Sequence, residues 1–216
     1  MQKRILKPLT LFTFLSSMAF NAHAVEPGFY LGLMAGPAIN DAKNKSVLFG
    51  NGSATTTTAT PSSTKNFGGR LFLGYKFIRF AAVESGFSFF SPIRYRANLT
   101  TGSNKPVAWF GTIDFSGKGS LPFYGFEVYG KLGLALNNLT KSSAFDIDSP
   151  DNPKKSNIWT FGPIYGVGAN YTLTQNWVAD LAVNRVNIGD VVGTITFYTL
   201  GVSYHFVDVY CGQFLC

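Results

Sequence analysis

The stretch GPIYGVGANYTLTQNWVADLAVNRVNIGD, residues 162–190, decides the fold class of this sequence. Large apolar or aromatic residues alternate with small or polar ones on both sides of a polar segment at 172–175. A period of two predicts β-strands, because successive side chains of a strand point to opposite faces. We therefore predict a β-hairpin whose apolar face carries Tyr165, Val167, Ala169, Tyr171, Leu181 and Val183.

The same alternation recurs outward from this hairpin along the whole chain, with turn signals between the segments. Eight strands are expected, at 28–38, 67–77, 80–90, 107–118, 123–137, 158–171, 176–187 and 194–206. Short turns are predicted near 78–79, 119–122 and 172–175, longer polar loops at 39–66, 91–106 and 138–157, and a smaller loop at 188–193. Short turns at one end and long loops at the other are typical of a barrel in an outer membrane.

We therefore predict an all-β fold, an eight-stranded antiparallel up-and-down transmembrane β-barrel, over residues 25–206. In lipid each unpaired backbone group costs several kcal/mol, so a sheet must close on itself. No segment after residue 24 approaches the roughly 18 uninterrupted apolar residues of a membrane-spanning helix. The alternative is a soluble β-sandwich, which would also alternate but would pack its aromatic faces against each other.

Residues 1–24 have the pattern of a secretory signal peptide. Its parts are the cationic Lys3, Arg4 and Lys7, the apolar run LTLFTFLSSMAF, and the cleavage signal Ala22-His23-Ala24. We expect cleavage near Ala24 in a Gram-negative bacterium, the barrel in the outer membrane, and residues 207–216 as a periplasmic tail. The alternative is an uncleaved N-terminal anchor, although the apolar run is short of the ~20 residues that span a bilayer.

The composition argues against a nucleic-acid partner. The formal net charge is +7, but three of the 18 Lys and Arg residues lie in the expected signal peptide. The remaining 15 stand against 11 acidic residues, a net charge of +4, and they form no basic stripe. The 23 Gly, 21 Phe and 10 Tyr suit a barrel that turns aromatic side chains outward and keeps small ones inside.

The barrel strands, though not the loops, resemble the N-terminal membrane domain of the OmpA family. The resemblance is strongest over 162–190 and in LGVSYHF, residues 200–206, and weaker in VYGKLGLAL (128–136) and VESGFSFF (83–90). It implies an eight-stranded outer-membrane barrel whose lumen is filled by ionic side chains. The chain ends ten residues after Phe206, so we expect no peptidoglycan-binding domain and no anchoring to the cell wall. The expected aromatic assembly signal, Tyr204-His205-Phe206, is internal here.

Charged residues recur on the predicted inward face of the strands. An eight-stranded barrel is just wide enough for side chains to fill it, and an isolated charge there is very costly. We predict an interior network of salt bridges and hydrogen bonds made by Arg70, Glu84, Asp114, Lys131, Asn170 and Asp180. Structural filling is the favoured interpretation, and a narrow gated pore for small solutes is the alternative.

Large aromatic residues near the ends of the predicted strands are candidates for interfacial girdles. They are Phe29, Trp109, Trp159, Phe161, Tyr165, Tyr171 and Tyr204. Ordinary hydrophobic packing predicts almost the same composition, so only their position near strand ends favours a girdle.

Ser203 and His205 share one face, a pairing that invites comparison with lipid A deacylases, which are small barrels with a Ser, a His and an acidic residue. Both side chains are expected to point inward, whereas hydrolysis of an acyl chain needs a lipid-facing site. We predict no catalytic residues and no enzyme, with a lipid A-modifying barrel as the less favoured alternative. One histidine after residue 24 and two cysteines cannot build a metal cluster, so no metal or cofactor is expected.

Cys211 and Cys216 lie in the expected periplasmic tail. That compartment is oxidising, so the two cysteines are candidates for a disulfide.

The segment SVLFGNGSATTTTATPSSTKN, residues 46–66, is a low-complexity loop that we expect to be mobile. We predict a structural or surface-interaction, adhesin-like role, with a host surface or a phage as candidate ligand of the long loops. The other expected partners are outer-membrane lipid, lipopolysaccharide and the barrel-assembly machinery.

Overall fold

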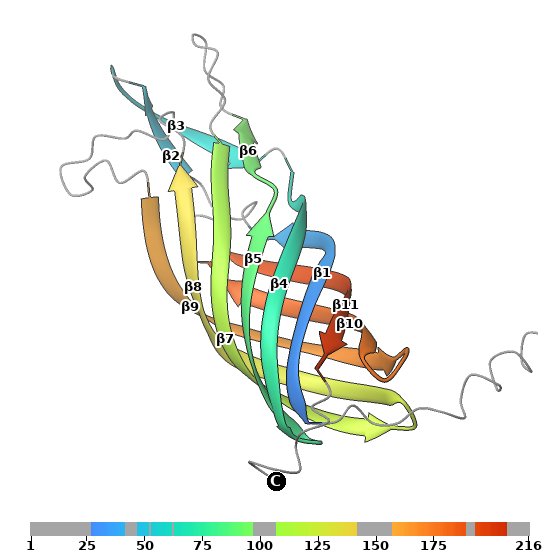
Figure 1. The fold of residues 1–216 in the computed structure, drawn as a ribbon. Coiled ribbons are helices and arrows are strands. Elements are labelled where there is room, and N and C mark those ends of the chain that lie inside the picture. Colours follow the sequence, from blue (N-terminus) through green and yellow to red (C-terminus); the bar gives the residue numbers. More distant parts are fainter. Residues whose placement is uncertain are drawn as a thin grey trace, which may run out of the picture.

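Figure 1 shows the fold in a computed structural model, which describes residues 27–41, 47–51, 53–61, 63–96, 107–141, 157–188 and 193–206. Eight long strands build the barrel: β1 (Gly28–Asn40), β4 (Lys65–Ile78), β5 (Ala81–Phe90), β7 (Val107–Phe123), β8 (Phe126–Lys141), β9 (Asn157–Thr172), β10 (Trp177–Asn187) and β11 (Thr194–His205). Three short strands join them: β2 (Val47–Asn51), β3 (Ser53–Pro61) and β6 (Ile93–Arg96). The predicted signal peptide and tail lie outside the described residues.

The eight long strands close into a ring. Each pairs antiparallel with the next along the chain, β7 pairs with both β5 and β8, and the first barrel strand pairs with the last. The closing seam between β1 and β11 runs from Tyr30 opposite His205 to Asn40 opposite Ile195. The prediction of a closed eight-stranded antiparallel barrel is confirmed. Within the described part of the chain there is no helix with the length and apolar character to cross a membrane.

Burial alternates along the barrel strands with a period of two. In β5, for instance, Ala82, Glu84, Gly86, Ser88 and Phe90 are buried, and their neighbours are exposed or partly exposed. The outward positions carry large apolar side chains, such as Leu132 at 69% and Phe161 at 82% exposure. A band of this size is costly in water and suits lipid. The β-sandwich alternative is wrong, because these side chains face outward instead of against a second sheet.

One predicted turn is wrong. The segment 119–122 is not a turn, because β7 continues to Phe123 and the chain reverses at Tyr124 and Gly125. Both have positive φ, 39° and 85°, as a two-residue hairpin turn with the twist of the flanking strands requires. Pro122 is tolerated in the strand because β5 ends its pairing with β7 at Gly119, which leaves one side of β7 open there.

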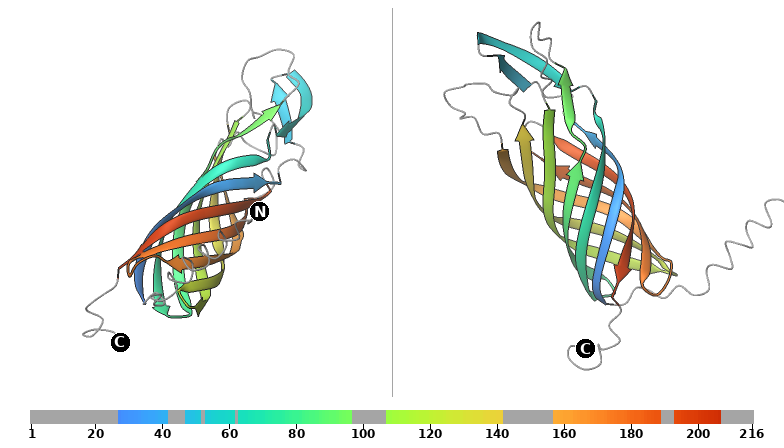
Figure 2. Two further views of the ribbon diagram at one scale, coloured as in Figure 1. Left: turned by 90° about the vertical axis from the view of Figure 1, so that its right-hand side faces the viewer. Right: turned by 45° about the horizontal axis from the view of Figure 1, so that its top comes forward.

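The barrel has two unlike ends. We call them the short-turn end, with the connections at 79–80, 124–125 and 173–176, and the long-loop end. Beyond the long-loop end, β2 and β3 form an antiparallel hairpin, and β3 pairs with β6, which pairs with β7 (Figure 2). Residues 46–66 therefore contain the strands β2 and β3, where a loop was expected. The threonines that made the segment look low in complexity are β-branched and favour strands.

Candidate functional site

The middle of the barrel interior is organised around Arg70, which β4 projects into the lumen. Its Nη1 donates to Oε1 of Glu84 on β5 at 2.7 Å. Its Nη2 and Nε donate to Oδ1 and Oδ2 of Asp114 on β7, at 2.7 and 3.3 Å. The planar guanidinium fork suits this two-point contact with a carboxylate. All three side chains are at most 3% exposed, so one cation offsets two buried carboxylates.

Glu84 receives contacts from other directions as well. Lys131 Nζ lies 3.5 Å from Oε1, and the hydroxyl of Tyr30 donates to Oε2 at 3.3 Å. Lys118 Nζ is 4.0 Å from Oε2. Glu84 is therefore the carboxylate on which Arg70, Lys118 and Lys131 converge.

Asp180 is held on the opposite side of this cluster. The hydroxyl of Tyr129 donates to its Oδ1 at 2.6 Å, and Lys118 Nζ lies 3.9 Å from its Oδ2. The same ammonium sits 3.8 Å from the centre of the Tyr129 ring, within cation–π range. Lys118 thus links Asp180 to Glu84 across the lumen.

A separate ion pair lies nearer the short-turn end, where Lys76 Nζ contacts Glu127 Oε2 at 2.6 Å. When this pair is included, the described residues contain as many buried cations as buried carboxylates. The cations are Arg70, Lys76, Lys118 and Lys131, and the carboxylates are Glu84, Asp114, Glu127 and Asp180. A filled lumen without net charge avoids the large cost of an isolated buried ion.

The structure brings together Arg70, Glu84, Asp114, Lys131 and Asp180 of the predicted network. Asn170 is the exception: it is buried, but its Oδ1 has no hydrogen-bond partner among the described residues. Tyr129, which was not predicted as a member of the network, donates a hydrogen bond to Asp180. Sequence reasoning missed five participants, although each lies at an inward position of the two-residue period: Tyr30, Lys76, Lys118, Glu127 and Tyr129.

Toward the long-loop end the lumen changes character and becomes apolar. Phe90 stacks on Phe110 with ring centres 5.0 Å apart and meets the edge of Phe197 at 5.1 Å. The complete apolar cluster comprises Ala38, Phe90, Ile93, Ala108, Phe110, Ala135, Leu139, Ile164, Val186, Ile188, Ile195 and Phe197. We call it the apolar layer. The interior is thus closed by charged side chains in its middle and by hydrocarbon nearer the long loops.

Ser203 and His205 contact each other inside the barrel. The hydroxyl oxygen of Ser203 lies 3.2 Å from Nε2 of His205, and the His205 ring stacks on Tyr30 with ring centres 4.8 Å apart. His205 Nδ1 is buried and has no hydrogen-bond partner among the described residues. A catalytic triad needs an acidic group at that nitrogen, and the described contacts supply none.

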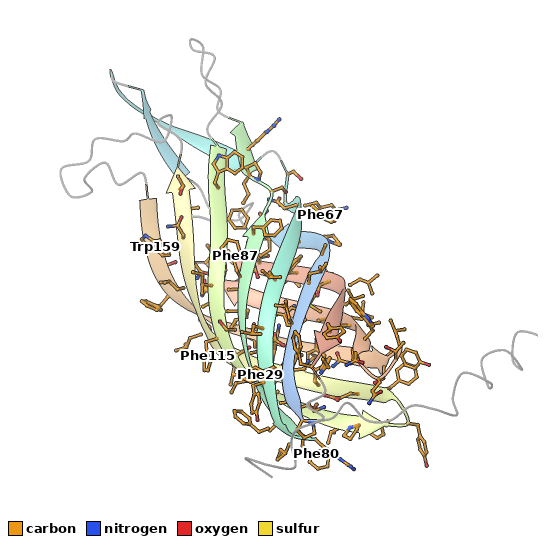
Figure 3. The ribbon with its side chains drawn as sticks, in the orientation of Figure 1. Phe29, Phe67, Phe80, Phe87, Phe115 and Trp159 are labelled. Atoms are coloured by element: carbon orange, nitrogen blue, oxygen red, sulfur yellow. The ribbon has the colours of Figure 1, made fainter. Side chains whose placement is uncertain are left out.

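Six of the seven aromatic residues expected in girdles lie on the outside of the barrel near its ends, and Phe29 and Trp159 among them are labelled in Figure 3. At the short-turn end, Phe29 contacts Tyr75, Tyr171 contacts Phe126, and Tyr204 contacts both Trp177 and Phe206. Trp109, Trp159 and Phe161 lie near the long-loop ends of β7 and β9. Tyr165 was misplaced, because β9 extends from Asn157 to Thr172 and Tyr165 lies at its middle.

The comparisons with known proteins agree with this architecture. The sequence profile of the family described as "Outer membrane protein beta-barrel domain" matches residues 8–206. A Coxiella burnetii protein described as uncharacterized is 27% identical over 214 residues, which cover 83% of this chain and 85% of that protein.

Two solved barrels have a similar fold. The outer membrane protein OprG of Pseudomonas aeruginosa is 17% identical with a TM-score of 0.55, covering 84% of this chain and 98% of OprG. Neisserial surface protein A is 19% identical with a TM-score of 0.53, covering 83% of this chain and 97% of that one. At these identities the likeness establishes the fold alone.

Proposed function

Since this chain belongs to the outer membrane protein β-barrel domain family and is a protein of the Gram-negative outer membrane, we propose that it is a closed barrel with a surface-interaction, adhesin-like role. In this orientation the short-turn end faces the periplasm and the long-loop end faces the exterior. The barrel anchors the chain in lipid, and the strands beyond its outer end contact a partner surface.

The observation that carries this proposal is the sheet beyond the barrel. The hairpin of β2 and β3 is joined through β6 to barrel strand β7, so backbone hydrogen bonds connect it to the anchored part. β2 pairs with β3 alone among the described strands and stands at the open edge of this sheet. An open edge offers unpaired backbone groups to which an extended segment of another protein can add.

The filled interior also supports an interaction role over transport. The ion pairs around Arg70 and the stacked rings of Phe90 and Phe110 occupy successive levels of the lumen. A solute would have to displace paired charges and then a hydrocarbon layer.

A deletion of the projecting strands tests the proposal. The variant replaces residues 47–61 by a short Gly-Ser linker and is displayed on a non-adherent Gram-negative host beside the full chain. We expect the full chain to promote adherence of the host cells to cultured epithelial monolayers and the deletion to abolish it. A matched variant shortened within residues 142–156 should keep the adherence. Slower gel migration after boiling reports that each variant still forms a closed barrel.

The proposal is wrong if host cells displaying the full chain adhere no better than the empty host. It is equally wrong if the 47–61 deletion leaves the adherence unchanged.

A narrow pore is the second candidate, because buried polar atoms in the lumen lack protein partners. Both side-chain polar atoms of Asn184 and Oδ1 of Asn170 have no hydrogen-bond partner among the described residues. Such atoms are commonly satisfied by internal water, and a chain of waters is the start of a conducting path. Discrete single-channel currents from the purified barrel in a planar bilayer would favour this function over a sealed anchor.

We also propose that the protein is not an enzyme. The contact between Ser203 and His205 is the chemistry that a lipid A-modifying barrel would need, but both side chains face the lumen. Unchanged lipid A after overexpression of the barrel would support this, whereas deacylated lipid A that disappears with His205→Ala would refute it.

A further inference from the structure

A groove of about 880 Å³ crosses the outside of the barrel from β7 to β11. Its floor is formed by Gly117, Gly119 and Gly130, and Tyr165 and Tyr198 stand along it. We call it the outer groove. It lies on the face that the family places in lipid, and the strands beyond the barrel do not line it.

The floor is bare because glycines meet across the pairing of β7 and β8. Gly119 lies opposite Gly130, and Gly117 lies opposite Leu132. A Cβ added at Gly119 or Gly130 would meet no atom within 4 Å, and neither residue has the left-handed backbone that favours glycine. The fold therefore does not need glycine at these two positions. The missing side chains leave the outer groove open.

A cation lies at one end of the outer groove. Arg185 is the one charged side chain that faces outward among the described side chains of β7 to β11. An arginine on the lipid face costs several kcal/mol at the middle of the bilayer and little at the interface. Arg185 lies two residues before Asn187, where β10 ends at the long-loop end. In the orientation proposed above, this end faces the outer lipid head groups.

Arg185 forms only a weak ion pair within the described part of the protein. Its Nη2 lies 3.7 Å from Oδ2 of Asp41, and the two side chains are 49% and 54% exposed. A long, exposed pair of this kind contributes little. The guanidinium remains accessible to a stronger acceptor, and the planar fork binds phosphate oxygens in pairs.

We propose that the outer groove binds lipopolysaccharide, with one acyl chain along the glycine floor and a lipid A phosphate at Arg185. The strands tilt in the barrel, so a groove perpendicular to them runs obliquely from the outer head-group level toward the membrane interior. An acyl chain descending from the outer leaflet would follow this course. The inference rests on the membrane orientation of the proposed function and not on adhesion.

The test measures lipopolysaccharide bound to the full barrel. The delipidated protein is placed in nanodiscs that contain lipopolysaccharide or phosphatidylglycerol as the anionic lipid, and bound lipid is quantified by native mass spectrometry after release. Gly130→Leu fills the outer groove, and Arg185→Gln removes the phosphate partner. Arg185→Gln removes a charge-assisted hydrogen bond and should retain roughly tenfold less lipopolysaccharide. Gly130→Leu should also retain less, because its side chain takes the space of the acyl chain.

Two matched variants serve as controls. Gly111→Leu adds the same side chain to β7 outside the outer groove, where a Cβ makes only ordinary contacts at 3.5 Å or more. Lys65→Gln removes an exposed cation at the long-loop end of β4. Both should retain lipopolysaccharide as the unmodified chain does, and all four variants should show the heat-dependent gel shift of a closed barrel.

The proposal is overturned if Gly130→Leu and Arg185→Gln bind as much lipopolysaccharide as the unmodified chain, or if the controls lose as much as they do. The proposal is also overturned if the unmodified chain retains as much phosphatidylglycerol as lipopolysaccharide, because the site would then not select lipopolysaccharide. Epithelial adherence is measured in a different assay. If the adhesin-like role fails there, the lipopolysaccharide test can still be carried out and interpreted.

Discussion

Arg70 and Glu84 are joined by a 2.7 Å ion pair between neighbouring strands, and less than a twentieth of either side chain is exposed. Arg70 also makes a two-point contact with Asp114. Because both carboxylates depend on it, Arg70→Met should destabilise the barrel by about 3–5 kcal/mol. Lys131→Met should cost less, since Lys131 has one carboxylate contact at 3.5 Å. Urea unfolding in phospholipid vesicles, followed by tryptophan fluorescence, measures both.

Lys65→Met is the control for Arg70→Met, because a change at an exposed position is usually within about 0.5 kcal/mol. Equal decreases in the free energy of unfolding for Arg70→Met and Lys131→Met would contradict the central place of Arg70. A changed ionic current from Lys131→Met without loss of stability would favour the pore.

The ion pair of Lys76 and Glu127 lends itself to charge reversal. Lys76→Glu and Glu127→Lys should each destabilise the barrel, because each leaves two like charges buried together. The double variant restores an opposite pair at the 2.6 Å contact and should recover about 1–3 kcal/mol in a double-mutant cycle. Additive losses in the same unfolding assay would mean that the two side chains do not interact.

The apolar layer should make a large contribution to stability. Phe197→Ala removes a buried ring that packs against Phe90 in a T-shaped arrangement and should cost about 3–5 kcal/mol. Phe161→Ala is the matched control on the same assay, because Phe161 is 82% exposed on the lipid face. If Phe161→Ala lowered the free energy of unfolding more than Phe197→Ala, contacts with lipid, and not the filled lumen, would dominate the stability.

Substitutions at the two turn residues, Tyr124 and Gly125, should change the stability of the barrel in opposite directions. Gly125→Ala places a Cβ at φ 85° and should cost about 1–2 kcal/mol. Tyr124→Asn should stabilise the barrel by some tenths of a kcal/mol, because asparagine tolerates the φ of 39° better than tyrosine. Gly111→Ala, at a glycine without positive φ, is the control. Unfolding midpoints that move the same way for both turn variants would contradict the assignment of the turn.

Part of the barrel interior is predictable from the sequence. The inward positions of Arg70, Glu84, Asp114, Lys131 and Asp180 follow from a period of two that depends only on local strand geometry. The same period also places Lys118 and Glu127 inward, within the expected strands 107–118 and 123–137. They were missed because a strand pattern does not show which inward charges meet. The threonine-rich segment shows the opposite error, since its composition suggests a loop while its β-branched residues suit a strand.

The sequence by itself determined the fold class, the number of barrel strands and the face on which most side chains lie, because alternation, closure in lipid and turn chemistry are local or general constraints. Only the tertiary structure decided which charges meet. Arg70 and Asp114 are 44 residues apart and belong to strands separated by β5, so their contact depends on strand register and on the width of the lumen. The outer groove is likewise a tertiary feature, since its glycines align only when β7 and β8 are paired in register.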